Sequence, residues 1–199
     1  MQTLNLSFDF WGTLAVSNPL YKEHQIELIC KTLGYKKEFV IEEFKKIKKK
    51  SSLLEEQGIQ PNRIALYYRF FDLMDSVEKL NNLIEQCDEL FLKYPPKIIL
   101  DIKKLSEVHN CYITSNTILV HSNVLSQFIS ESFWIPKENM VFSDQVNVTK
   151  PNLKIWKSHK TNFDYHIGDN IVTDGACENL NIKFLNTHKN EHLFLFENL

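Results

Sequence analysis

The sequence predicts an α/β protein with a parallel sheet and a helical segment inserted after its first strand. Two patterns predict this class. From about residue 98 to residue 187, short apolar runs alternate with helical stretches, which is the rhythm of a parallel sheet with helical crossovers. Residues 17–94 instead show helical periodicity without a strand. At 199 residues, of which 43% are apolar, the chain can form one α/β core with an insertion.

The first element is a strand over residues 4–8, where apolar and polar residues alternate with the period of two that strands have. This strand places Asp9 at its C-terminal end, which is where open α/β sheets bind ligands. Gly12 then permits a tight turn, and Thr13 adds a hydroxyl close to the Asp9 carboxylate.

Four helices are predicted in the inserted segment. Asn18 and Pro19 are typical of an N-cap and a first helical position, and Gly34 is typical of a helix end. The other three helices are expected over residues 38–54, from Pro61, and from Asp75 to Tyr94. We therefore predict a core of residues 1–16 and 96–199 and a helical cap of residues 17–95.

The rest of the core is expected to alternate between helices and strands. The helices are predicted through Leu105, over 120–129, from Pro151 and over 172–180, and the strands over 111–113, 140–142, 165–167 and 182–185. The apolar tail from His192 is expected to pack on the core or to form a sheet edge. Trp134 and Trp156 are assigned to core packing.

Composition excludes some classes of partner. The net charge of −2, from 23 basic and 25 acidic residues, gives no indication of a nucleic-acid or membrane partner. The four cysteines lie far apart in sequence, as reduced core residues do, and form no pair of metal-binding or redox type. The chain enters its first strand without a leader and has no apolar stretch of membrane-spanning length, so we expect a cytoplasmic protein. The sequence does not indicate an oligomeric state.

Polar residues also follow later strands. Ser115 and Asn116 come after one of them, and the serine hydroxyl and the asparagine amide could donate to a phosphoryl oxygen if a helix begins there. Asp169 and Asp174 follow another strand and supply the hard oxygen ligands that magnesium prefers. Taken alone, each of these residues also fits a structural role. Ser115 with Asn116 fits a helix cap, Lys150 fits a residue of a solvated loop, and Asp174 fits a cap of the next helix.

Together these segments resemble, in order, the four motifs of the haloacid dehalogenase-like (HAD) superfamily, in the subfamily with a helical cap. Residues 9–14 have the form Asp-x-x-Gly-Thr-Leu, and residues 113–116 read Ile-Thr-Ser-Asn. Residues 143–151 resemble Ser-Asp-(Glu/Gln)-Val-x-x-x-Lys-Pro, and residues 165–176 contain Gly-Asp with a second Asp five residues on. The resemblance spans about residues 4–187 and implies a Rossmann-like core.

The resemblance implies a hydrolase that dephosphorylates a small phosphorylated metabolite. Asp9 would attack phosphorus and form an aspartyl phosphate, Ser115 would hold the phosphoryl group, and Lys150 would offset the negative charges that meet there. The cap would close over the site, exclude water and select the substrate. The residues expected to contact the substrate are Trp11, Thr13 and Asn116.

The resemblance also implies magnesium as the cofactor. The ion would be held by Asp9, by the backbone carbonyl of Trp11 and by Asp169, with Asp174 in an outer, water-mediated position. A carbonyl ligand does not depend on the side chain, so Trp11 is compatible with this role.

The chain departs from the family at Trp11, because most phosphatases of the family carry there a second Asp that protonates the leaving group. Such proton transfer is typically worth about 10²- to 10⁴-fold in rate. In one interpretation the enzyme is still a phosphatase or phosphotransferase, and the acid is unnecessary for a good leaving group or comes from the substrate or from the cap. His24, Arg63 and Arg69 are the cap candidates, although such residues are more often structural or solvated.

Two other interpretations stay open. The 2-haloacid dehalogenases also carry an aromatic residue at this position, but they work without magnesium, lack an intact Gly-Asp in motif four and use an arginine early in the cap. This chain has Gly168 followed by Asp169 and no arginine before Arg63. Alternatively, catalysis has been lost and the protein binds a phosphorylated ligand or a partner protein, although a binder needs no nucleophile.

Overall fold

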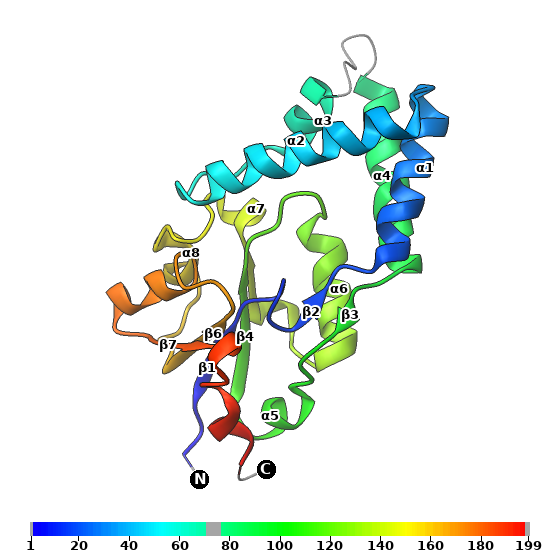
Figure 1. Cartoon of the computed structure of the whole chain (residues 1–199). Helices are drawn as coiled ribbons and strands as arrows, with labels where there is room; N and C mark the ends of the chain where they lie inside the picture. The colour runs from blue at the N-terminus through cyan, green and yellow to red at the C-terminus, as the bar shows by residue number, and fades with distance from the viewer. Residues whose placement is uncertain (1, 71–76, 198–199) are drawn as a thin grey trace.

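A five-stranded parallel sheet forms the core of the computed structural model, which describes residues 2–70 and 77–197 (Figure 1). The strands stand in the order β5-β4-β1-β6-β7. Their bounds are Asn5–Phe8 for β1, Asn110–Ser115 for β4, Met140–Phe142 for β5, Tyr165–Gly168 for β6 and Lys183–Asn186 for β7. The predicted α/β class with a parallel sheet is confirmed.

The central strand is β1, which pairs with β4 on one side and with β6 on the other. Leu6 lies in register with Cys111 and with Tyr165. Because helices cover both faces of the sheet, the polar residues of β1 do not form a solvent-exposed face, and Ser7 is as fully buried as Leu6. The Ser7 hydroxyl is instead satisfied by the hydroxyl of Thr114 at 2.8 Å.

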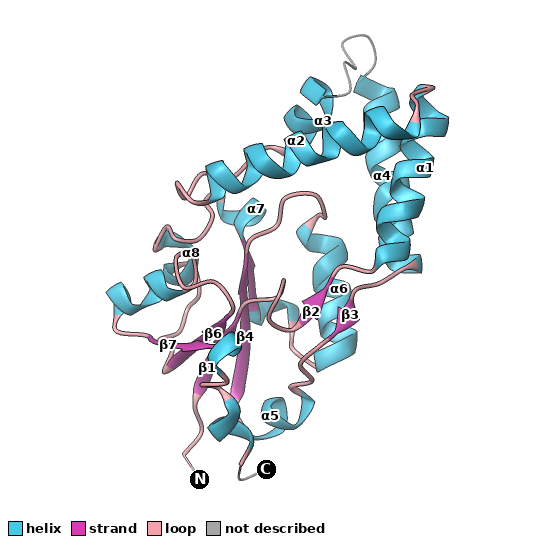
Figure 2. Ribbon diagram, viewed as in Figure 1, coloured by secondary structure: helices cyan, strands magenta, loops and turns pink. Residues whose placement is uncertain are grey.

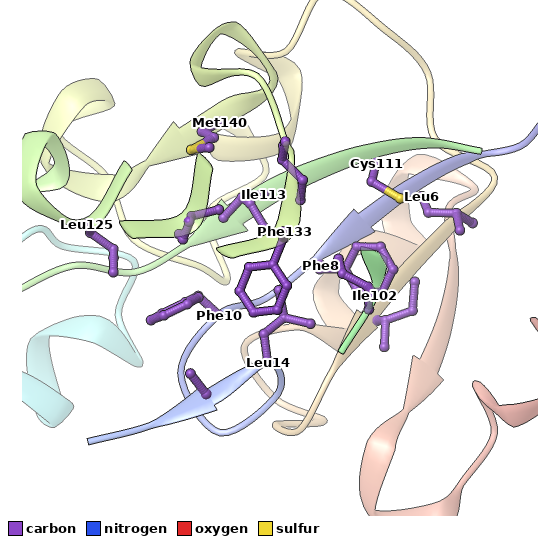
Figure 3. Close-up of a cluster of buried hydrophobic side chains, with 14 of the residues drawn as sticks. Leu6, Phe8, Phe10, Leu14, Ile102, Cys111, Ile113, Leu125, Phe133 and Met140 are labelled. Carbon is purple, nitrogen blue, oxygen red and sulfur yellow. The ribbon is translucent and has the colours of Figure 1, made fainter. Parts of the chain in front are cut away.

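Helices enclose the sheet on both sides. On one side lie α5 (Lys103–Val108) and α6 (Ser122–Phe133), whose apolar residues join those of β1 and β4 in a cluster that Figure 3 shows in part. On the other side α8 (Lys154–Lys157) buries Trp156 in a second cluster with Cys177. The short helix α7 (Ser143–Val146) follows β5 directly.

A helical region is inserted between β1 and β4, which follow one another along the chain among the strands of this sheet. Its two connections to the core run through a separate antiparallel pair, β2 (Ala15–Val16) and β3 (Lys97–Ile98). Between them in sequence lie α1 (Pro19–Leu33), α2 (Lys37–Glu55), α3 (Arg63–Phe70) and α4 (Val77–Lys93), as Figure 2 shows. These helices bury an apolar cluster of their own, which includes Ile29, Ile47 and Leu83.

The residues predicted to begin and end the first helix of the inserted region do so in α1. The side chain of Asn18 accepts a hydrogen bond from the backbone N–H of Leu20 at 3.1 Å, and Pro19 is the first helical residue. Gly34 ends α1 with a φ of 74°, in the left-handed region that glycine adopts most readily. Asp75, predicted to begin the fourth helix, lies outside the described residues.

Two of the predicted core helices are wrong in kind or in place. The segment predicted as a helix over 172–180 is a turn followed by a 3₁₀ helix, Gly175–Leu180. The side chain of Asn170 accepts the backbone N–H groups of Val172 and Thr173, and such a local turn competes with a regular helix start. The helix predicted to start near Pro151 begins three residues later, at Lys154.

One tryptophan assignment is also wrong, whereas the tail prediction is confirmed. Trp156 is buried, but Trp134 is 59% exposed, because it ends α6 with a φ of 59° and lies on the surface. The apolar tail forms a 3₁₀ turn, Leu193–Phe196, that buries Leu195 in the core. The four cysteines are free. None of the helices within residues 2–70 and 77–197 is long and apolar enough to cross a membrane.

Candidate active site

Asp9 directly follows the central strand, at the carboxyl edge of the sheet, and is 5% exposed. The hydroxyl of Ser115, the last residue of β4, donates to Oδ1 of Asp9 at 2.9 Å. The ammonium of Lys150 donates to the same oxygen at 2.6 Å. The three residues predicted as catalytic, far apart in sequence, therefore meet at one carboxylate.

Lys150 bridges Asp9 to a second buried acid. Its Nζ atom also contacts Oδ1 of Asp174 at 2.5 Å, and Lys150 itself is 2% exposed. Asp174 receives further support, since Nε2 of His166 lies 3.3 Å from Oδ1 and the backbone N–H of Asn170 donates to Oδ2 at 3.0 Å. Both oxygens of Asp174 are thus engaged by protein groups.

A buried chain of polar side chains continues from Asp174 beneath the site. Nδ1 of His166 lies 2.9 Å from the Ser7 hydroxyl, which contacts Thr114, and the Thr114 hydroxyl lies 2.9 Å from Nε2 of His159. Burial lowers the pKa of His166, and it lowers the pKa of His159 to about 4. Both imidazoles are therefore neutral at pH 7 and can both donate and accept hydrogen bonds in this chain.

Three acids at this edge form a group with the chemistry of a metal site. One carboxylate oxygen each from Asp9, Asp169 and Asp174 lie within 4.8 Å of one another. Three ionised carboxylates carry three negative charges, and the ammonium of Lys150 neutralises one of them, which leaves a net charge of −2. Such a set of hard oxygen donors fits a divalent cation of the Mg²⁺ type.

Two glycines allow the acids to approach the backbone. Gly12 has a φ of 82°, and a Cβ atom there would lie 2.5 Å from Oδ2 of Asp169. A Cβ atom on Gly168 would overlap the side chain of Asp174. Gly175, which lies in the same motif, shows no such close approach. The first two glycines therefore provide space that the acidic group occupies.

The ionisable groups shift one another strongly. Burial raises the pKa of Asp9 to about 7, opposed by the charge of Lys150 and reinforced by that of Asp174. Burial also acts to raise the pKa of Asp174, but Lys150 and His166 outweigh it and hold that pKa well below its usual range. The two carboxylates keep the pKa of Lys150 above its ordinary value despite burial. A bound cation would favour the ionised form of Asp9.

Two of the three residues predicted to contact substrate lie in the turn after Asp9. The Trp11 ring packs on Phe10 and on Phe91 of helix α4, with centroids 4.8 and 6.4 Å apart, so it connects the core to the inserted region. Thr13 is 1% exposed, and its hydroxyl has no hydrogen-bond partner among the described residues. A buried, unsatisfied hydroxyl is costly unless a bound group completes it.

Asn116, the third residue predicted to contact substrate, binds the backbone of Lys150. Its Oδ1 atom accepts the backbone N–H of Lys150 at 2.8 Å, and its Nδ2 atom donates to the Lys150 carbonyl at 3.3 Å. The expectation that Ser115 and Asn116 stand at a helix start is wrong, because a loop follows β4 and α6 begins only at Ser122. Asp144 accepts the first N–H of that helix at 3.0 Å.

The cap residues considered as proton donors take part in the internal structure of the inserted region. His24 stacks on Tyr94 with ring centroids 4.5 Å apart. Arg63 forms a double hydrogen bond with Asp88, at 2.9 and 3.2 Å. The side chain of Arg69 lies outside what the structure describes.

Sequence reasoning missed an acid at the end of helix α2. Glu55 is half-buried, and its carboxyl group interacts with the side chain of Asn116. Burial raises the pKa of Glu55 to about 7, although the charge of Lys150 opposes the rise. No local signal marks this residue, because an acidic pair at a helix end is typical of an exposed surface. His166 was missed as well, although a histidine within an apolar strand is a signal of a buried polar role.

The parallel sheet with Asp9 after its central strand, the acids that follow β6 and the helical cap inserted between strands define the haloacid dehalogenase-like fold. Solved structures of this fold match almost the whole chain. That of the HAD-hydrolase YfnB from Bacillus subtilis, bound to magnesium, has a TM-score of 0.66 and 13% identity, covering 92% of this chain and 88% of its own.

Structures with two different activities are similar to the chain. The 2-haloacid dehalogenase from Pseudomonas syringae pv. Tomato DC3000 has a TM-score of 0.61 and 14% identity, covering 93% of this chain and 86% of its own. The HAD phosphatase from Thermococcus onnurineus has a TM-score of 0.57 and 16% identity, covering 94% and 86%. No protein-family model and no curated protein matches the chain significantly. At such identities the likeness establishes the fold alone.

Proposed function

We propose that this protein is a magnesium-dependent hydrolase that dephosphorylates a small phosphorylated metabolite through an aspartyl-phosphate intermediate. The observation that carries the proposal is the meeting of Ser115 and Lys150 on the buried carboxylate of Asp9, beside two further acids. A nucleophile, a hydroxyl donor, a fixed cation and an acidic group suited to a metal are the parts that phosphoryl transfer requires.

Each of the three central residues has a distinct task. The Asp9 carboxylate attacks phosphorus in line with the leaving group and becomes the acyl phosphate. Ser115 is held beside Asp9 by its hydrogen bond, and its hydroxyl can turn from Asp9 to donate to an oxygen of the transferred group. Lys150 supplies a buried positive charge between the nucleophile and the phosphoryl oxygens, where it offsets the repulsion of two anions.

The proposed ligands for magnesium are Asp9, Asp169 and the backbone carbonyl of Trp11. Asp174 acts from an outer position, in agreement with the three protein groups that already occupy its oxygens. When bound, the ion supplies positive charge that stabilises the phosphoryl oxygens during transfer. The unsatisfied hydroxyl of Thr13 supports a bound group in the turn after Asp9.

The position of the cap supports a small substrate. The turn after α2 contacts the loops that carry Asn116 and Lys150, and we therefore place the substrate in a space between cap and core, above Asp9. We assign Asn116 and Trp11 to the walls of this space. The proposed division at residues 16/17 and 95/96 separates the part that performs the chemistry from the part that selects the substrate.

A 2-haloacid dehalogenase is the second candidate, favoured by the aromatic Trp11 and by the shared fold. The structure weighs against it in two respects. Asp169 is present at the acidic group, and Arg63, the first arginine of the chain, is paired with Asp88 within the cap. A purely binding role is disfavoured by the same acidic group, since a carboxylate facing phosphate weakens binding.

The test is a panel of p-nitrophenyl phosphate, acetyl phosphate, sugar phosphates and 2-chloropropionate, assayed with Mg²⁺ and with EDTA. We expect phosphate release that is abolished by EDTA and by Asp9→Asn, which keeps the shape of the side chain. Asp101→Asn is the matched control, because Asp101 is exposed. Phosphate release that survives in Asp9→Asn would refute the proposal, and halide release indifferent to EDTA would establish the dehalogenase instead.

A further inference from the structure

The turn that ends helix α2 is docked onto two loops of the core. The Thr149 hydroxyl donates to the backbone carbonyl of Glu55 at 3.2 Å, and the Thr149 N–H donates to the carbonyl of Gly58 at 3.3 Å. Ile59 forms an isolated antiparallel bridge with Val148. This turn is therefore fixed against the loop that carries Lys150, as the course of the chain in Figure 1 shows.

The same turn reaches the loop that follows Ser115. The side chain of Gln60 donates to the backbone carbonyl of Thr117 at 2.8 Å. The carboxyl group of Glu55, at the start of this turn, interacts with the side chain of Asn116, the residue next to Ser115. Glu55 is thus an acid that the cap delivers to the residues around the proposed nucleophile.

We propose that Glu55 is the proton donor to the leaving group and the base that then activates water, in the role for which Trp11 has no acidic group. This assignment rests on the proposed phosphatase function. In an in-line transfer the leaving group departs opposite Asp9, and the incoming water attacks the acyl phosphate from that same side. The turn after α2 is the part of the cap that contacts the loops next to Ser115 and Lys150, so one residue of this turn can serve both half-reactions.

The electrostatics of Glu55 suit this exchange. Burial raises the pKa of Glu55 to about 7, and the charges that act on it are Lys150, which lowers the pKa, and Asp9 and Glu56, which raise it. An anionic phosphate ester beside Glu55 further favours its protonated form, because two anions repel. A carboxyl group near neutrality can therefore bind the substrate as an acid and release its proton in the transition state.

The steps balance as follows. Asp9 forms a bond to phosphorus, the bond from phosphorus to the ester oxygen breaks, and that oxygen takes the proton of Glu55 to leave as an alcohol. Water then attacks phosphorus and gives a proton to the Glu55 carboxylate, while the bond from phosphorus to Asp9 breaks. Hydrogen phosphate leaves, and both carboxyl groups return to their starting states.

The experiment compares Glu55→Gln with Glu56→Gln, an exposed acid on the same turn. Glutamine keeps the shape of Glu55, so the fold should be retained, and urea unfolding checks this. The substrates are p-nitrophenyl phosphate, whose leaving group departs without a proton, and phenyl phosphate, whose leaving group needs one. Rapid-mixing measurement of the released phenol separates the first half-reaction from steady turnover.

With p-nitrophenyl phosphate, Glu55→Gln should release about one equivalent of p-nitrophenol in a burst and then turn over slowly, because the aspartyl phosphate accumulates. With phenyl phosphate it should show no burst and a loss of kcat of about 10²- to 10⁴-fold. The kcat of the wild type for phenyl phosphate should fall as the pH rises and Glu55 loses its proton in the complex, whereas Glu55→Gln should lack this fall. Glu56→Gln should keep the wild-type kcat on both esters, with at most a small downward shift of the pH profile, because the charge of Glu56 raises the pKa of Glu55.

Other outcomes are distinguishable. A folded Glu55→Gln protein with the kinetics of the wild type overturns this assignment alone, and so does a rise in KM with kcat unchanged, which would make Glu55 a binding residue. If Glu55→Gln does not fold, Glu55→Asp keeps the carboxyl group, and equal losses on both esters in that variant count against proton transfer. A wild type that releases no phenol from either ester overturns the proposed function and this assignment with it.

Discussion

Replacing Lys150 by Met tests whether its ammonium holds the acidic group together. Lys150 is 2% exposed and contacts Asp9 at 2.6 Å and Asp174 at 2.5 Å. Without it, these two carboxylates face each other with oxygens within 4.8 Å. At an effective dielectric constant of about 20, two unit charges at that separation repel by about 3 kcal/mol. Removing one partner of a buried ion pair typically costs about 3–5 kcal/mol. We expect Lys150→Met to lower the free energy of unfolding at pH 8 by about that amount.

Urea unfolding in the presence of EDTA measures the effect. Lys157→Met is the matched control, because Lys157 is exposed on helix α8, and its effect should stay within about 0.5 kcal/mol. Adding Asp174→Asn to Lys150→Met removes the repulsion and should restore about 1–3 kcal/mol, a coupling expected of residues in contact. If Lys150→Met is as stable as Lys157→Met, or if the double variant is the less stable one, the ammonium does not hold the acids as inferred.

Two further substitutions probe the surroundings of the site. Gly12→Ala should lower the Mg²⁺ affinity measured by calorimetric titration by about 10- to 100-fold, because the added Cβ would displace Asp169. Gly34→Ala is the control, because Gly34 has a similar φ but open space around it. Both should lose about 1–2 kcal/mol of stability, and equal Mg²⁺ affinity in the two would contradict the inference. As the pH falls from 7 to 4, His159 becomes protonated in the unfolded chain but stays neutral in the folded protein until about pH 4. The free energy of unfolding of the wild type should therefore fall by up to about 3 kcal/mol more than that of His159→Gln. Unfolding curves that fall in parallel for the two proteins would exclude this source of acid sensitivity.

The sheet and the place of Asp9 in it were predictable because their signals are local. A period of two before Asp9, a glycine with positive φ after it and apolar runs at regular spacing all report on the chain within a few residues. The first cap helix, α1, follows equally from Asn18, Pro19 and Gly34, which act on the backbone next to them. The segment 172–180 was mispredicted because the side chain of Asn170 satisfies backbone donors in competition with a helix.

The parts of the site that were not predictable depend on contacts between segments distant in sequence. Nothing near Glu55 indicates that the turn after α2 meets Asn116. The likeness of motif two to a helix start was misleading because Asn116 is engaged with the backbone of Lys150 instead. Trp134 was mispredicted for a different reason. Its size suggests burial, but its backbone has a φ of 59° and lies at an exposed helix end.

The insertion of the cap between β1 and β4 separates neighbouring strands by a long stretch of chain, since Asn5 and Asn110, which pair in the sheet, are 105 positions apart. The entropy lost when such a loop closes grows only with the logarithm of its length, and a doubling costs about 0.6 kcal/mol. The pairing of β2 with β3 brings the two ends of the insertion together. The cap can therefore lengthen, shrink or be exchanged with little thermodynamic cost to the sheet, while the residues around Asp9 stay in place.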